Sequence, residues 1–366
     1  MSLVLQDIGK TVAGEMHIEG IDLELVPGSV NVLLGRTQAG KTTLMRLMAG
    51  LDRPTTGRVL VDGKDVTGLS VRQRNVAMVY QQFINYPSFT VYDNIASPLR
   101  RAGRPRDEVD DKVRAAAQTL QIEPLLDRLP SELSGGQQQR TALARALVKA
   151  ADLLLLDEPL VNLDYKLREE LRAELQVIFR EGRSIVVYAT TEPLEALMLG
   201  GNTIVLDEGR MLQRGATVEV YHEPASIRVG QVFSDPPMNL IEGIVVDEVA
   251  RLGDGLRLPL GGHLSDLEPG LYHFGVRASH LSLSRHAPAD VEFPATVDLA
   301  EISGSETFIH ANHSGTSWVV QEEGVHSLGL GERLQVYVNP RHVFAFGENG
   351  ELLAAPGRDP QPLAAQ

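Results

Sequence analysis

The pattern of apolar and polar residues predicts an α/β domain over residues 1–235. Leu153–Leu156 is an unbroken apolar run, the pattern of a strand buried on both faces of a parallel sheet. Val30–Gly35 is a second apolar run that ends in a glycine-containing loop, and Lys41–Leu51 then has the pattern of a helix. Two further runs with a strand pattern are Ser184–Thr190 and Thr203–Leu206.

A mostly helical insert is predicted between about residues 90 and 135. Within it, Asp107–Leu120 follows Pro105, a residue tolerated at helix starts. Its small and apolar residues fall on one helical face, which predicts burial of that face. These residues are Val109, Val113, Ala116, Ala117 and Leu120.

The pattern changes after Asp235-Pro236-Pro237, which predicts a second domain over residues 236–366. Short alternating runs separated by Gly, Asn and Pro indicate a small β-barrel or sandwich. The runs are Ile241–Val246, His273–Val276, Ala295–Leu299, Thr307–Ala311, Trp318–Val320 and Leu334–Val338. The Pro- and Ala-rich end from about Ala355 is predicted to be frayed.

Composition narrows the class of protein. The 34 Lys and Arg residues against 48 Asp and Glu residues give a net charge of −14, which argues against a broad nucleic-acid surface. There is no Cys, so disulfides and thiolate metal sites are excluded. The start of the chain lacks the pattern of a secretory signal, and the window Asn75–Tyr92 is too polar to cross a bilayer. We therefore expect a soluble protein that reaches a membrane only through a partner.

A phosphate-binding motif, G-x-x-x-x-G-K-[ST], lies between the first apolar run and the helix that follows it. Backbone N–H groups and a helix N-terminus can cradle phosphates there, with Lys41 reaching the β- and γ-oxygens and the Thr42 hydroxyl on Mg²⁺. An ordinary glycine-containing turn is the alternative. The expected nucleotide contacts are Gly35, Arg36, Thr37, Gln38, Ala39, Gly40, Lys41, Thr42 and Thr43.

Two carboxylates follow the buried run Leu153–Leu156. Asp157 at the strand end can hold Mg²⁺, usually through water, and Glu158 is placed to polarise an attacking water. A strand that ends in Asp-Glu is by itself more often a solvated strand end. Together with the phosphate loop, the pair predicts a nucleotide-hydrolysing site.

The run Leu133-Ser134-Gly135-Gly136-Gln137-Gln138-Gln139-Arg140 resembles the signature sequence of the ATP-binding cassette (ABC) ATPases. Ser134 would cap a helix whose glycine-rich N-terminus points at an anion. The resemblance implies that this anion is the γ-phosphate held by an opposite protomer. A plain Ser-Gly-Gly helix start is the alternative. The signature contacts expected with nucleotide are Ser134, Gly135, Gly136 and Gln137.

The resemblance extends over essentially the whole chain. It implies that Gln81, after the strand Val76–Tyr80, meets Mg²⁺ and senses a membrane subunit, and that Asp164 lies in a loop at a dimer interface near the nucleotide. The C-terminal region is similar to the accessory β-domain of carbohydrate importers of the maltose type. The segments that carry this similarity are Pro237-Met238-Asn239-Leu240, Gly275-Val276-Arg277 and Gly304-Ser305-Glu306-Thr307.

Three positions depart from the family pattern, and all belong to the site formed by this chain's own phosphate loop. Val12 stands where the family usually stacks adenine on an aromatic ring. Gln38 replaces a usual Gly, which costs strain if φ is positive there. Thr191 replaces the switch-loop histidine of the family, and with Glu158 and Gln81 it is a candidate catalytic residue. A threonine or a water could substitute, but loss of a positioned donor commonly costs about 10²–10³ in rate.

The resemblance implies an ATP- and Mg²⁺-dependent ATPase that powers an importer for a sugar or a polyol such as glycerol. Its location would be peripheral, on the cytoplasmic face of the inner membrane. Its partners would be two permease subunits, docked near Gln81–Val91, and a second, different ATPase protomer. A solute-binding protein would act indirectly, and no nucleic acid is expected. Two alternatives stay open: a catalytically weak subunit that completes its partner's site, and a soluble ABC ATPase unrelated to transport. The latter should show a long coiled coil, a second cassette or a basic face, and none is visible.

Overall fold

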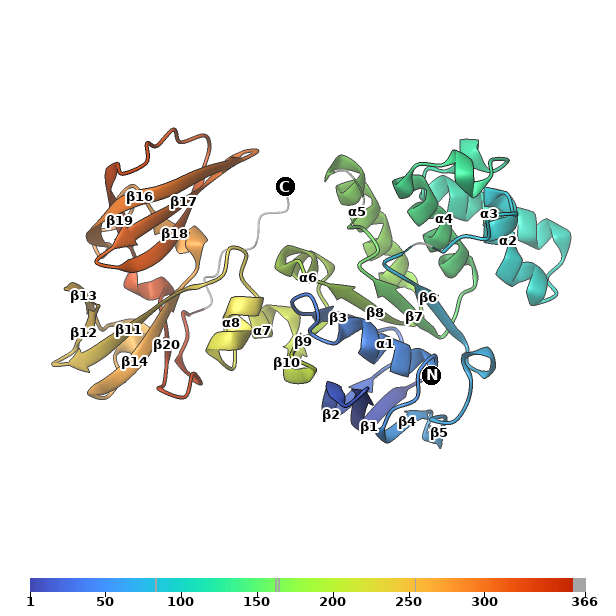
Figure 1. Ribbon diagram of the computed structural model, residues 1–366, viewed down its shortest axis with the longest axis horizontal. Coiled ribbons are helices and arrows are strands. Elements are labelled where there is room, and N and C mark those ends of the chain that lie inside the picture. Colours follow the sequence, from blue (N-terminus) through green and yellow to red (C-terminus); the bar gives the residue numbers. More distant parts are fainter. Residues whose placement is uncertain (83, 162, 164, 254, 358–366) are drawn as a thin grey trace. The chain divides into compact units, whose positions relative to one another are not determined.

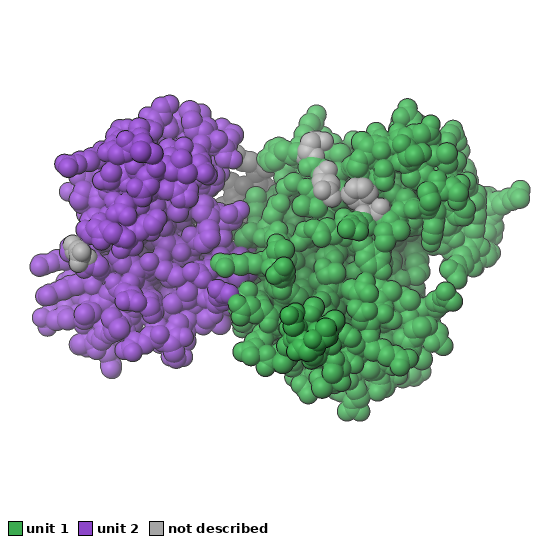
Figure 2. Space-filling view, in the orientation of Figure 1, with its two compact units in different colours: residues 1–217 green, residues 218–366 purple. Residues whose placement is uncertain are grey.

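The computed structural model describes residues 1–357 except 83, 162, 164 and 254. The chain forms two compact units, Met1–Thr217 and Val218–Gln366 (Figure 2). Within the described part of the chain, every helix is too short or too polar to cross a lipid bilayer.

A six-stranded sheet forms the centre of the first unit (Figure 1). Its strand order is β10-β9-β3-β8-β7-β6, and neighbours run parallel except for the antiparallel pair of β9 and β10. Every residue of β7 and β8 is buried, as the apolar runs predicted. The strands are β3 (Val30–Leu34), β6 (Val76–Val79), β7 (Leu153–Asp157), β8 (Ile185–Thr190), β9 (Asn202–Asp207) and β10 (Arg210–Ala216).

A second, antiparallel sheet has the order β2-β1-β4-β5 and was not predicted from the sequence. Helix α1 (Lys41–Ala49) contributes Leu44, Met45 and Met48 to a core shared with both sheets. This packing fixes the start of α1 between them. The strands are β1 (Leu3–Val12), β2 (Glu15–Leu25), β4 (Thr56–Val61) and β5 (Lys64–Asp65).

The predicted helical insert contains α2 (Val91–Arg101) and α3 (Arg106–Thr119), and continues into α4 (Gly135–Val148), which packs against both. Thr90 caps α2 by accepting the Asp93 N–H at 3.1 Å. The predicted inner face of α3 is correct, because Val109, Val113 and Ala117 are buried. Two further helices of this unit are α5 (Tyr165–Glu181) and α6 (Pro193–Leu199).

The second unit is a barrel-like domain of two antiparallel sheets, which agrees with the predicted fold. Their orders are β13-β12-β11-β14-β20-β21 and β15-β19-β16-β17-β18. Both sheets contribute to one core, in which Trp318 packs on Phe293 with ring centroids 4.9 Å apart. All six predicted runs lie within strands. The strands are β11 (Asn239–Val246), β12 (Val249–Leu252), β13 (Leu256–Pro259), β14 (Gly270–Val276), β15 (Leu281–Ser282), β16 (Val291–Ser303), β17 (Glu306–His313), β18 (Thr316–Glu323), β19 (Arg333–Val338), β20 (Phe344–Phe346) and β21 (Leu352–Ala354).

The second unit begins at residue 218, whereas the sequence pattern changes at residue 235. The intervening segment holds α7 (Thr217–His222) and α8 (Ile227–Val232). The Ile227 N–H donates to the Gly350 carbonyl at 2.9 Å, and the Leu352 N–H donates to the Ala225 carbonyl at 3.2 Å. These long-range hydrogen bonds join the segment to the C-terminal strands. They cannot be predicted from the local sequence pattern, so the sequence did not indicate that this segment belongs to the second unit. The predicted frayed end from about Ala355 lies mostly outside the described residues.

Candidate functional site

The phosphate loop connects β3 to α1, and its glycines are required by close packing. Gly40 has φ = 99° and precedes the first residue of α1. A Cβ atom there would come within 3.0 Å of the His17 carbonyl oxygen. Gln38 also lies in the left-handed region, at φ = 69°, which carries a cost of about 1 kcal/mol for a non-glycine residue. The expected strain at Gln38 is therefore present.

Lys41 is buried at the start of α1, with its ammonium group held by the loop and by a carboxylate. Its Nζ donates to the Gly35 carbonyl at 2.7 Å and to the Arg36 carbonyl at 3.0 Å, and lies 3.6 Å from Glu158 Oε1. Desolvation lowers the pKa of Lys41, while the charges of Glu158 and Asp157 oppose that shift. A cation in this position is suited to phosphate oxygens, which can replace its present partners.

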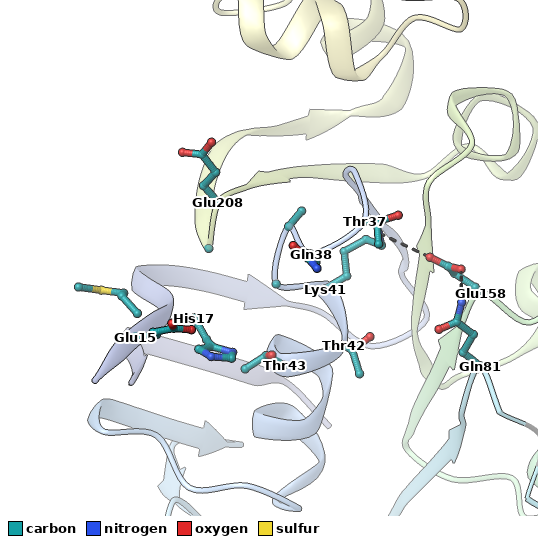
Figure 3. A pocket seen from close by; sticks show the side chains of 14 residues that line it. Glu15, His17, Thr37, Gln38, Lys41, Thr42, Thr43, Gln81, Glu158 and Glu208 are labelled. Carbon is teal, nitrogen blue, oxygen red and sulfur yellow. Dashed lines mark hydrogen bonds and ion pairs between the residues drawn. The ribbon is translucent and has the colours of Figure 1, made fainter. Parts of the chain in front are cut away.

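Polar side chains from the start of α1, from the end of β7 and from the loops that follow β6 and β7 meet where the parallel strands of the central sheet end; Figure 3 shows Thr42, Gln81 and Glu158 among them. Thr42 Oγ1 donates to Asp157 Oδ2 at 2.7 Å, and Gln81 Nε2 donates to Glu158 Oε2 at 2.8 Å. Burial raises the pKa of Asp157, against the Thr42 hydrogen bond and the Lys41 charge. Hydroxyl, carboxylate and amide oxygens are the hard ligands that Mg²⁺ prefers. Thr42, Asp157 and Gln81 therefore fit a Mg²⁺ ion.

Glu158 directly follows β7 and has an unusual backbone conformation, with φ = 47°. Its N–H donates to the Ala189 carbonyl of β8 at 3.0 Å, which fixes the backbone despite the cost. Strained residues of this kind concentrate at functional sites because surrounding structure must hold them. The strain is consistent with a positioned Glu158 carboxylate.

Lys41, Thr42, Gln81 and Glu158 border a cavity of about 630 Å³ (Figure 3). The predicted residues that line it are Thr37, Gln38, Ala39, Gly40, Lys41, Thr42, Thr43, Gln81 and Glu158. Five other lining residues were not predicted from the sequence; they come from the start of β2 and from the turn between β9 and β10. They are Glu15, Met16, His17, Glu208 and Gly209. No motif marks them, because only tertiary packing brings them to the phosphate loop.

Other predicted residues do not line this cavity. Gly35, Arg36 and Asp157 are beside it without lining it, and three more lie elsewhere or outside the described residues. Val12 is 44% exposed at the end of β1, pairs with Glu15, and does not line the cavity. Thr191 is exposed just after β8 and does not line it either. Asp164 lies outside the described residues.

A buried carboxylate binds the side chains at the end of β8, directly before Thr191. Glu195 of α6 accepts from Thr190 Oγ1 at 2.6 Å and from the Tyr188 hydroxyl at 3.2 Å. Burial raises the pKa of Glu195, and both hydrogen bonds oppose the shift. The Glu192 N–H donates to Thr190 Oγ1 at 3.0 Å. The Gly35 N–H donates to the Thr190 carbonyl at 3.3 Å and ties this loop to the phosphate loop.

The signature run forms the N-terminus of α4, as predicted. Ser134 Oγ accepts the Gln137 N–H, and Gln137 Oε1 accepts the Ser134 N–H at 2.9 Å, which completes a capping box. Ser134 and Gly135 are exposed, and Gly136 is half-buried. None of Ser134, Gly135, Gly136 or Gln137 lines the cavity. The capping box uses the N–H groups of Ser134 and Gln137, so a group from another molecule would meet the N–H groups of Gly135 and Gly136.

A second hollow, of about 470 Å³, lies between β6, α2 and α4. Tyr86 and Phe89 line it and are 48% and 42% exposed, with ring centroids 5.4 Å apart. The Arg145 guanidinium lies 5.0 Å from the centre of the Tyr86 ring. Exposed aromatic rings beside a hollow are typical of a protein-binding surface.

Comparisons with known proteins agree with this geometry. A family model described as "ABC transporter" matches residues 18–161, and one described as "TOBE domain" matches residues 274–346. The chain is 37% identical over 356 residues to the sn-glycerol-3-phosphate import ATP-binding protein of Paraburkholderia xenovorans, covering 94% of this chain and 97% of that one. The corresponding protein of Salmonella typhimurium is 36% identical, with 95% and 99% covered.

Solved structures of ABC transporter cassettes are similar to part of this chain. A dimeric bacterial ABC transporter cassette superposes with a TM-score of 0.55 at 26% identity, covering 59% of this chain and 98% of that chain. A dimeric cassette in a post-hydrolysis state bound to ADP and Pi superposes with a TM-score of 0.54, also at 26% identity and with the same coverage.

Proposed function

Because the chain belongs to the ATP-binding subunits of ABC transporters, we propose that it powers the import of a glycerol-type polyol, free or phosphorylated. The main support for ATP hydrolysis is that Lys41, Thr42, Asp157 and Glu158 lie together at one edge of the central sheet. The names of its relatives, which are sn-glycerol-3-phosphate import proteins, favour the solute class. As an importer ATPase it acts peripherally, on the cytoplasmic face of the inner membrane.

The roles of the side chains follow from their positions. Lys41 and the N-terminus of α1 would hold the β- and γ-phosphates, and Thr42, Asp157 and Gln81 would hold Mg²⁺. The ion supplies positive charge that neutralises the phosphate oxygens. Glu158 orients the attacking water and accepts its proton. Nucleotide binding replaces the present contacts of Glu158 with Lys41 and Gln81, which releases its carboxylate for that water.

Two protomers together complete each ATP site in this proposal. The exposed start of α4 at Ser134 supplies N–H groups to the γ-phosphate on an opposite phosphate loop. The opposite protomer is a different ATPase, since Thr191 and the strained Gln38 weaken only this chain's own site. Ser134, which serves the partner's site, keeps its full capping box. The catalytically weak subunit remains the second candidate, favoured by the same Thr191.

The hollow beside Tyr86 and Phe89 receives a segment of one permease subunit, and the opposite protomer receives a segment of the other. Within the predicted docking segment Gln81–Val91, Pro87 is exposed without lining the hollow, and Phe83 lies outside the described residues. Gln81 precedes this segment and bonds Glu158, so docking and the nucleotide site share a short connection. A solute-binding protein acts through the permeases.

Uptake by the reconstituted importer tests the solute class. We expect ATP-dependent accumulation of labelled glycerol or sn-glycerol 3-phosphate, with no accumulation of maltose at the same concentration. Maltose uptake without uptake of either glycerol compound would contradict the proposed solute class while leaving the ATPase assignment intact.

Exchange of Thr191→His should raise hydrolysis at this chain's own site by about tenfold or more, because a missing transition-state donor costs about 10²–10³. The Glu195 bonds to Thr190 and Tyr188 hold the backbone in place for the longer side chain. Single-turnover hydrolysis by the purified chain measures the effect, with Thr191→Ala as the control. An unchanged rate in Thr191→His would mean that the threonine, or a water, already does this work.

A further inference from the structure

The cavity at the phosphate loop has two chemically different ends (Figure 3). Lys41, Thr42 and Glu158 border one end, where phosphates and the attacking water belong. The first residues of β2 and the turn at Glu208-Gly209 border the other. A nucleotide held by its phosphates at the first end has to place its ribose and base toward the second.

His17 is anchored firmly at this second end. Its neighbour Ile18 is fully buried in the core. A Cβ atom at Gly209 would lie 2.6 Å from the His17 carbonyl oxygen, so the two backbones touch. The Glu19 N–H donates to the Gly209 carbonyl at 2.9 Å, and the Gly209 N–H donates to the Ala39 carbonyl at 3.1 Å. The start of β2 therefore keeps a fixed position relative to the phosphate loop.

The side chain of His17 is exposed, and Figure 3 shows its ring at the end of the cavity away from Glu158. Among the described residues that line this cavity, His17 carries the one aromatic ring. Val12 has no ring and does not line the cavity. Aromatic side chains bind bases by stacking, which depends little on which base is present.

We propose that His17 supplies the face on which the nucleoside of the bound nucleotide stacks, in place of an aromatic residue at Val12. This inference rests on the proposed ATP-binding function and specifies how this chain holds the nucleoside part. Because stacking tolerates either purine, His17 contributes equally to ATP and GTP affinity, and it contributes nothing to a ligand that consists of phosphates alone.

The test compares three ligands on the full-length chain in the presence of Mg²⁺: ATP, GTP and inorganic tripolyphosphate, each displacing a fluorescent ATP analogue. We expect His17→Leu to raise the Kd of ATP and of GTP about tenfold and to leave the Kd of tripolyphosphate unchanged. His17→Phe should restore purine binding, because it restores a ring. Glu24→Ala, an exposed position on β2 outside the cavity, is the matched control.

Two outcomes would overturn this proposal: unchanged ATP and GTP affinity in His17→Leu, or an equal loss of tripolyphosphate affinity, which would indicate damage to the phosphate loop. If the His17→Leu variant does not fold, the His17→Gln variant takes its place in the comparison. Glutamine also lacks a ring, but it has a polar side chain. Failure of the underlying function has a different signature. In that case the unaltered chain binds neither ATP nor tripolyphosphate, or Lys41→Ala leaves the binding of both unchanged.

Discussion

Glu158→Gln should lower the rate of ATP hydrolysis at this chain's own site by about 10²–10⁴, because an amide cannot accept the proton of the attacking water. The exchange keeps the size of the side chain and its place beside Gln81. Nucleotide binding should be retained or tightened, since a negative charge 3.6 Å from Lys41 is removed from the phosphate site.

Single-turnover hydrolysis with the chain in excess over ATP measures this rate without contributions from product release. Titration of the same variant with ATP and Mg²⁺ gives the affinity. Glu24→Gln, which removes an exposed carboxylate outside the cavity, is the matched control. A Glu158→Gln variant that hydrolyses ATP at the unaltered rate would show that another group activates the water.

Ser134→Arg should lower the rate of ATP hydrolysis by the assembled ATPase pair by about a hundredfold or more. This is the size of effect expected when a preorganised hydrogen-bond donor to the transition state is lost. The substitution removes the cap of α4 and places a long cation over N–H groups that are already at the positive end of the helix. The start of the helix can then no longer approach a γ-phosphate.

The same variant should bind ATP at its own phosphate loop with unchanged affinity, because Ser134 does not line that cavity. Ser134→Thr, which keeps a hydroxyl cap, is the control and should retain most of the rate. Hydrolysis by the pair and ATP binding by the isolated chain are measured side by side. Loss of binding by the isolated chain would contradict the idea that the signature acts on an opposite protomer.

The sequence predicted the parts of the site that depend on local order. The phosphate loop, the carboxylates Asp157 and Glu158 and the helix cap at Ser134 each follow from a few neighbouring residues and the element that carries them. The inner face of α3 and the fully buried strand β7 follow from apolar periodicity in the same way.

The remaining parts depend on long-range packing. The N-terminal sheet escaped prediction because β1 has irregular register with β2, with shifts between Leu5 and Ile8 that break the alternation of apolar residues. The lining residues Glu15, His17 and Glu208 reach the cavity only after this sheet and the β9–β10 turn have packed on the phosphate loop. A pattern read along the chain contains no signal for such contacts.

The most direct test of the central claim is ATP hydrolysis by the assembled importer, which contains this chain and the permeases. The same importer carrying Lys41→Ala in this chain is the comparison. Lys41 is buried at the start of α1 and donates to the phosphate loop of this chain's own site. We predict that the unaltered complex hydrolyses ATP only with Mg²⁺, and that Lys41→Ala abolishes ATP binding at this site and lowers the total rate. An unchanged rate together with unchanged ATP binding at this site would contradict the assignment of this chain as an ATP-hydrolysing subunit.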